Sequence, residues 1–195
     1  MRLALLAMLV LHAQSPQTAE MPSPFGLQMG TPRAKLGEVV KEVSRFKYQL
    51  ASVSKPHNDL QSYVATVTPK AGLCFIRALS PVWKTKNDGM ELRSKFEDMT
   101  AQMESVYGKP FLVDSLQPDS KRTESKDWMA ALLEKERTLQ ARWSAADDGL
   151  PMKPSIAKIY VGTLAVSPTS GHVIVEYYFT NYEDCMAELG GDALK

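Results

Sequence analysis

The chain has 195 residues, 44% of them hydrophobic, and its 23 basic and 22 acidic residues give a formal net charge of +1. This balance excludes the concentrated basic surface that nucleic-acid binding requires, so we expect no nucleic-acid partner. The length suits one domain with a full hydrophobic core.

The first residues have the pattern of a secretory signal peptide. Arg2 supplies a positive start, residues 3–11 are uninterruptedly apolar, and Ala13 offers a small residue for cleavage. This run is too short to span a bilayer, which takes about 20 apolar residues. A buried N-terminal helix is the alternative, but polar, proline-containing sequence follows at once. We therefore predict a signal peptide over residues 1–13, a flexible arm over residues 14–24, and a mature protein that is periplasmic or extracellular and has no membrane span.

The mature sequence opens with a pattern typical of an amphipathic helix. Thr31 can cap this helix, Pro32 suits its first turn, and apolar residues then recur at helical spacing. These apolar residues are Leu36, Val39, Val40, Val43 and Phe46.

Three strands are expected next. Residues 47–53 form a short strand-like run, residues 55–59 interrupt it as a loop, and residues 60–68 have the composition of a second strand. Residues 69–72 form a turn, so the following strand, Gly72 to Leu79, should return antiparallel to the second.

That third strand carries Cys74, and the only other cysteine is Cys185. In an oxidising compartment two cysteines have one possible pairing, so we predict a disulfide between them. It would close a loop of more than 100 residues, for which the chain-entropy model gives roughly 4 to 5 kcal/mol. Two free buried thiols are the main alternative. A metal site or a nucleophile is disfavoured because neither cysteine has a partner at ligand spacing.

The middle of the chain predicts two helices. Apolar residues from Leu92 to Tyr107 fall on one helical stripe that ends at Gly108. After a short strand at residues 111–113, a third helix is expected to begin near Thr123 or Ser125 and to end before Gly149. It would place four apolar residues on one face, which favours core packing over a ligand cleft: Trp128, Leu132, Leu139 and Trp143.

The chain closes with a β-hairpin. Residues 156–166 and 172–180 are strand-like, and residues 167–171 form the turn between them. Strands follow strands and helices follow helices, which predicts an α+β fold. We expect a single domain over residues 25–195, with an antiparallel sheet of about five strands and three helices packed mainly on one face.

Few residues suggest chemistry. Outside the predicted signal peptide the histidines are His57 and His172. His57 lies beside Asp59 in a loop, so these two are candidate site residues, although such residues also form ordinary turns. His172 begins a strand and is expected to be an exposed hairpin residue. The sequence has no nucleophile elbow, zinc-protease helix or phosphate-binding glycine loop. We expect no metal and no cofactor.

Several segments resemble small exported bacterial proteins of uncharacterised families. They are Phe25–Thr31 (Phe-Gly-Leu-Gln-Met-Gly-Thr), Gly72–Ile76, Tyr107–Pro110 (Tyr-Gly-Lys-Pro) and Tyr177–Cys185. The opening is also faintly similar to that of the small lipoprotein of the outer-membrane assembly machine, although this chain lacks the lipid-bearing cysteine and is much longer. The resemblance implies a style of fold and an exported location.

Two functions are consistent with the sequence. The first is a non-enzymatic extracytoplasmic module that binds a protein or an envelope component, for which exposed strand edges would be suitable. The second is a small extracytoplasmic hydrolase that uses His57 with a nearby carboxylate.

Overall fold

The computed structural model describes residues 23–145 and 152–190. The predicted signal peptide, most of the predicted arm and Gly149 lie outside these ranges. Within the described residues, no helix is long and apolar enough to cross a membrane.

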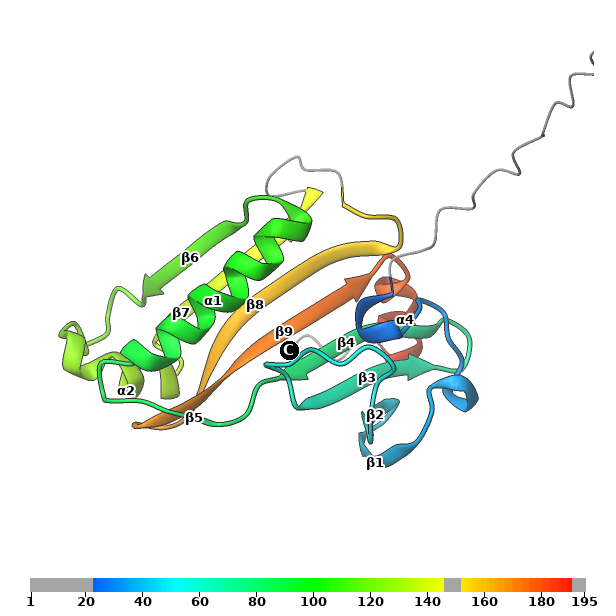
Figure 1. The fold of residues 1–195 in the computed structure, drawn as a ribbon, viewed down its shortest axis with the longest axis horizontal. Coiled ribbons are helices and arrows are strands. Elements are labelled where there is room, and N and C mark those ends of the chain that lie inside the picture. Colours follow the sequence, from blue (N-terminus) through cyan, green and yellow to red (C-terminus); the bar gives the residue numbers. More distant parts are fainter. Residues whose placement is uncertain (1–22, 146–151, 191–195) are drawn as a thin grey trace, which may run out of the picture.

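The structure is an α+β fold built on one antiparallel sheet (Figure 1). Its strands are β1 (Val39–Ser44), β2 (Lys47–Leu50), β3 (Ser62–Thr68), β4 (Gly72–Leu79), β5 (Trp83–Lys84), β6 (Phe111–Leu116), β7 (Arg137–Ser144), β8 (Ile156–Ser167) and β9 (Ser170–Phe179). The helices are α1 (Met90–Tyr107), α2 (Trp128–Leu133) and α4 (Tyr182–Leu189), with short 3-10 turns at Pro24–Gly26, Arg33–Lys35 and Ser125–Asp127.

The strand order is β1-β2-β3-β4-β9-β8-β7-β6, and β5 pairs with β9. The fold class is therefore as predicted, but the expectation of about five strands is wrong, because the described residues form nine. The extra strands come mostly from segments whose apolar spacing also fits a helix.

The sheet has one covered face and one open face, and β9 shows the division. Val175 and Tyr177 are buried on the covered side, where the Tyr177 hydroxyl lies 3.7 Å from Met103 Sδ of α1. Glu176 and Tyr178 alternate with them and therefore point to the other side. Helices α1 and α2 share one hydrophobic core with the covered face. Helix α4 begins on the open side, where the Tyr182 ring centroid lies 4.9 Å from that of Tyr178.

The helix expected to start at Thr31 is not present. Gly37 has a φ of 82°, which ends the short 3-10 turn, and the following residues form the hairpin β1–β2. Val40 is 60% exposed and Val43 46%, so the apparent helical stripe buries little. β-Branched residues favour strands, and here a pairing partner follows directly along the chain.

The prediction of the third helix is correct only for its first two turns, and its continuation beyond them is wrong. Helix α2 ends at Leu133, Lys135 has a φ of 62°, and the chain then turns into β7. Trp143 is a fully buried strand residue whose Nε1–H donates to the carbonyl of Gly108 at 2.7 Å. Leu139 and Trp143 keep a spacing of four residues, which places them on one face of a strand as well as of a helix.

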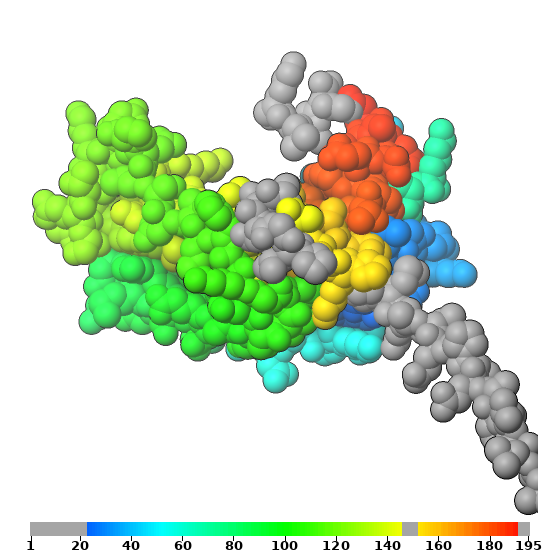
Figure 2. Space-filling view, turned by 90° about the horizontal axis from the view of Figure 1, so that it is seen from above, coloured from blue at the N-terminus to red at the C-terminus, as the bar shows by residue number. Residues whose placement is uncertain are grey.

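Strands β3 and β4, helix α1 and the terminal hairpin occur where the sequence predicts them. The hairpin turn is tighter than expected, because Ser167 pairs with Ser170 across a two-residue loop. The space-filling view shows the C-terminal residues next to the start of β8 and to the first described residues (Figure 2). The Thr180 N–H donates to the carbonyl of Ser155 at 2.9 Å. This bond joins the C-terminal residues to the start of β8.

Candidate binding surface

The imidazole of His57 fastens a loop to helix α1. Its Nδ1 accepts a hydrogen bond from the Asp59 N–H at 3.2 Å, and its Nε2 lies 3.0 Å from the Gln102 side-chain oxygen. That oxygen can only accept, so the neutral ring carries its proton on Nε2. The His57 N–H in turn donates to the Tyr63 hydroxyl at 3.0 Å. Both ring nitrogens therefore take part in hydrogen bonds, one within the loop and one to helix α1.

The Asp59 carboxylate lies 3.9 Å from His57 Nδ1 and is 46% exposed. It borders a cavity of about 300 Å³ between α1 and the link from β4 to β5. On the same cavity wall the Lys95 ammonium lies 4.9 Å from the Trp83 ring centroid. The structure thus brings Asp59 and His57 together as the sequence suggests, but it gives the pair no unoccupied ring nitrogen to act as a base.

His172 is half-buried, not exposed as expected. Its Nδ1 lies 2.8 Å from the Ser80 carbonyl oxygen, to which it donates. This bond ties β9 to the end of β4. Across the part of the chain that the structure describes, no group of three or more His, Cys, Asp or Glu side chains is placed to hold a metal ion.

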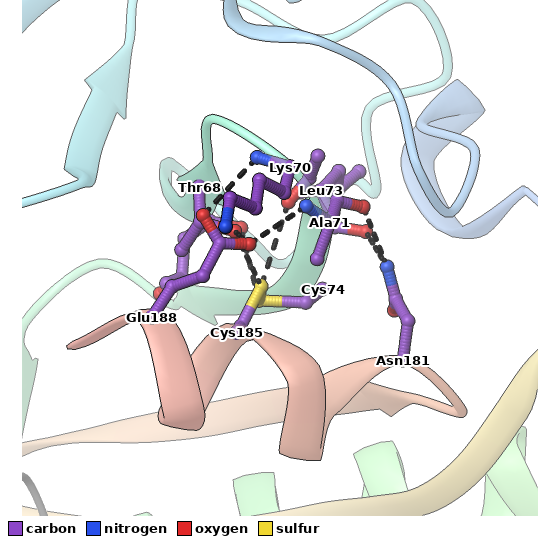
Figure 3. The surroundings of a disulfide bond; sticks show 10 residues. Thr68, Lys70, Ala71, Leu73, Cys74, Asn181, Cys185 and Glu188 are labelled. Atoms are coloured by element: carbon purple, nitrogen blue, oxygen red, sulfur yellow. Dashed lines mark hydrogen bonds between the residues drawn. A yellow bond between two sulfur atoms is a disulfide. The ribbon is translucent and has the colours of Figure 1, made fainter. Parts of the chain in front are cut away.

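The two cysteines lie at disulfide distance, and each is fully buried (Figure 3). Cys74 comes from β4 and Cys185 from α4, and their Cα atoms are 6.4 Å apart. The predicted pair is therefore brought together by the fold. It joins a central strand to the last helix.

Hydrogen bonds reinforce this junction. The Glu188 carboxylate accepts from the Thr68 hydroxyl and the Ala71 N–H at 2.8 Å each, and from the Lys70 N–H at 3.1 Å (Figure 3). Burial alone would raise the pKa of Glu188, but these donors outweigh it and lower the pKa. The Asn181 amide also donates to the carbonyls of Ala71 and Leu73. Helix α4 is thus held firmly on the β3–β4 turn.

The main path of the sheet ends in two outer strands, β1 and β6, and their edges differ. Strand β1 is interrupted by two register shifts, one between Val39 and Lys41 and one between Glu42 and Ser44. Bulges and charged residues on an outer strand oppose the addition of another strand. The β1 edge is therefore protected.

Strand β6 has no such bulge, and its single charged residue, Asp114, is paired. All six of its residues pair with β7 without a register shift, and its sequence contains no Lys or Pro. Just beyond the strand, the Gln117 N–H donates to the Glu136 carbonyl at 2.7 Å. This bond shows which residues of β6 bond inward to β7. Because bonding alternates in an antiparallel ladder, the N–H and C=O groups of Leu112, Asp114 and Leu116 point outward.

The side chains beside this edge are apolar and accessible. Phe111 is 44% exposed and Leu112 is 60% exposed, while the single charge, Asp114, forms an ion pair with Arg137. The sequence predicts a strand only over residues 111–113, and it does not show that this strand lies at the edge of the sheet. The residue types Phe, Leu and Val just after a helix end were the available signal.

Comparison with family models, with curated proteins and with solved structures finds no match for this chain. The resemblance to exported bacterial proteins therefore stays a prediction.

Proposed function

We propose that this protein is a non-enzymatic extracytoplasmic binding module that takes up an extended segment of a protein partner along strand β6. The observation that carries the proposal is the uninterrupted outer edge of β6, with three outward-facing peptide groups at Leu112, Asp114 and Leu116. Such an edge is complementary to one kind of ligand, another extended chain. Exposed Leu112 would favour a partner strand that carries an apolar side chain opposite it.

Two features support the extracytoplasmic location. A cysteine pair at disulfide distance is compatible with an oxidising compartment, and the sequence opens with an apolar run typical of export. The hydrolase alternative draws no support from the geometry, because both ring nitrogens of His57 are already hydrogen-bonded.

A proline substitution can test the edge without breaking the sheet. Asp114→Pro removes an outward N–H, and it leaves the inward bonds of Val113 and Ser115 to β7 intact. Asp114→Asn is the matched control, because it also removes the ion pair with Arg137 but keeps the N–H. Lys41→Pro places the same residue on the protected edge.

We expect the immobilised protein to recover a partner from cell-envelope extract, and Asp114→Asn and Lys41→Pro to recover it equally well. Asp114→Pro should lose it while it keeps the circular dichroism spectrum and thermal midpoint of Asp114→Asn. In the complex, the amides of Leu112, Asp114 and Leu116 should exchange hydrogen more slowly. Recovery of the same partner by Asp114→Pro would contradict the proposal.

A further inference from the structure

The hairpin β1–β2 lies at the end of the sheet opposite to β6 (Figure 1). Its register shifts oppose the addition of another strand, so it is unsuited to the kind of ligand proposed for β6. Two apolar side chains are nevertheless accessible on it: Val40 is 60% exposed and Val43 is 46% exposed. Both lie at the register shifts, where a residue of β1 has no partner across the ladder.

The same segment is rich in cations. From residue 33 to residue 47 the chain has five basic residues against two acidic ones, a local excess that the near-neutral composition of the whole chain does not reveal. The basic residues are Arg33, Lys35, Lys41, Arg45 and Lys47, and the acidic residues are Glu38 and Glu42. Within the described part of the chain, none of these basic residues forms an ion pair.

Strand register places two of the cations on the open face of the sheet. Lys47 pairs with Thr66 of β3, which pairs with Phe75 of β4. The Phe75 ring packs against Tyr178 on the open face, with 4.8 Å between the centroids, so Lys47 projects to that face as well. Lys41 pairs with β2 two residues beyond Lys47, and it therefore projects to the same face.

The acidic residue of the hairpin lies on the opposite face from these two lysines. Glu42 pairs with Tyr48, which packs against the hydrophobic core on the covered side. Its carboxylate accepts a hydrogen bond from the Phe46 N–H at 2.9 Å, which holds it at the turn. Arg45 is exposed at the tip of the hairpin, where its guanidinium lies 4.9 Å from the Phe46 ring centroid.

A groove on the open face lacks such an excess of positive charge. It lies over the ends of β7, β8 and β9, where the Tyr160 and Tyr178 ring centroids are 5.6 Å apart. The charge of its Lys158 is balanced by that of Glu183, and Arg142 has a further interaction of its own. The unpaired cations of the hairpin therefore stand apart from that groove.

Protection of the sheet edge accounts for only part of the hairpin surface. A lysine on an outer strand opposes pairing with another chain, which is a sufficient reason for Lys41. It gives no reason for Arg45 at the turn, nor for two exposed valines beside the charges. Cations next to accessible apolar side chains are the two components of binding at a bilayer surface, where cations attract anionic headgroups and apolar groups enter the interface.

We propose that the β1–β2 hairpin binds the surface of a bilayer that contains anionic lipids. Lys41, Arg45 and Lys47 would contact the headgroups, and Val40 and Val43 would enter the interfacial region. A nucleic acid is less suitable, because this small charge excess would neutralise few phosphates and valines cannot stack on bases. The hairpin and β6 lie at opposite ends of the sheet, so this proposal can fail without affecting the one made for β6.

Two triple variants with the same net charge separate this surface from general electrostatic attraction. The hairpin variant combines Lys41→Gln, Arg45→Gln and Lys47→Gln. The control variant combines Lys84→Gln, Lys109→Gln and Lys121→Gln, which are exposed lysines elsewhere that form no ion pair with a described residue. Both keep the apolar run at residues 3–11, so any lipid binding by that run is common to them.

We expect the full-length wild-type chain to sediment with vesicles of phosphatidylcholine that contain about one-third phosphatidylglycerol. The hairpin variant should lose at least about tenfold in affinity for these vesicles and should behave like wild type with phosphatidylcholine alone. The control variant should change by no more than about twofold. Circular dichroism confirms that each variant is folded. Equal affinity of the two triple variants for the anionic vesicles would overturn the proposal.

The valines test the apolar part of the contact. Val40→Ser combined with Val43→Ser should weaken binding to the anionic vesicles roughly fivefold. Val82→Ser combined with Val106→Ser is the control, because these valines are 54% and 51% exposed on other parts of the molecule, and it should bind like wild type. Unchanged binding by the first pair would overturn the proposal. Tighter binding of a single-stranded oligonucleotide than of vesicles, at equal phosphate concentration, would assign the surface to nucleic acid instead.

Discussion

At the scale of single residues, Glu91 connects the β5–α1 link to the start of α1. Its carboxylate accepts hydrogen bonds from the Thr85 hydroxyl at 2.7 Å and from the Lys86 N–H at 3.0 Å. The bond from Thr85, followed by that from the Lys86 backbone, lowers the pKa of Glu91 from 4.5 to about 2. These bonds favour the ionised form of the carboxylate.

This pKa predicts a pH dependence of stability. A lowered pKa in the folded state contributes stability above pH 4.5, and that contribution is lost as the pH falls from about 4.5 to about 2. Glu91→Gln lacks the ionised form at every pH. In urea unfolding at pH 5 and pH 3, the variant should lose less stability between the two values than wild type does. Glu97→Gln, at an exposed position of the same helix, should behave like wild type, and a Glu91→Gln slope equal to that of wild type would contradict the assignment.

At the scale of elements, the β3–β4 turn depends on a glycine. Gly72 has a φ of 67°, and a Cβ there would collide with the backbone of Gly30. The two segments are joined next to this point, where the Gly30 N–H donates to the Leu73 carbonyl at 2.8 Å. Gly37 has a similar φ of 82° but open space around it.

The two glycines allow strain and collision to be separated. Gly37→Ala should cost about 1 kcal/mol of unfolding free energy, because only the left-handed backbone penalty applies. Gly72→Ala should cost at least about 2 kcal/mol more, because the backbone of residue 30 must also move. Urea unfolding of both variants measures the difference. Equal losses would mean that the close approach of Gly30 has no energetic role.

The spacing of apolar residues along the sequence predicted correctly those elements whose apolar residues are buried together in the core. Leu92, Phe96 and Met99 recur at helical spacing in α1, and all three are buried. Val40 and Val43 show comparable spacing but stay exposed, because they lie on a strand that pairs with β2. A spacing of three or four residues cannot reveal that pairing, which is why the first predicted helix is wrong.

The candidate sites were less predictable than the fold, because they depend on contacts between distant segments. His57 was identifiable as a candidate, yet its structural role depends on Gln102, 45 residues away. The sequence places Tyr160 and Tyr178 in two separate predicted strands. Only the register of β8 against β9 brings the two rings together. The β6 edge likewise depends on which strand lies outermost in the sheet.

At the scale of the whole molecule, a disulfide between Cys74 and Cys185 would span a sequence separation of 111 residues. It would enclose the segment from β4 to the start of α4, which includes α1, α2 and the strands of the terminal hairpin. A cross-link of this length restricts the unfolded chain far more than it restricts the folded one. Its effect therefore belongs to the domain and not to one contact.

Intact mass measurement tests the bond directly. In denaturant with an alkylating agent and no reductant, neither Cys74 nor Cys185 should be modified, and after reduction both should be. The Cys74→Ala and Cys185→Ala double variant should lose up to about 5 kcal/mol of unfolding free energy, since the closed loop exceeds 100 residues. Some of that loss is offset if Glu188 and Asn181 still hold α4 on the β3–β4 turn. Two alkylated thiols without reductant would show that the buried pair is not bonded, and the support it gives to an oxidising location would be removed with it.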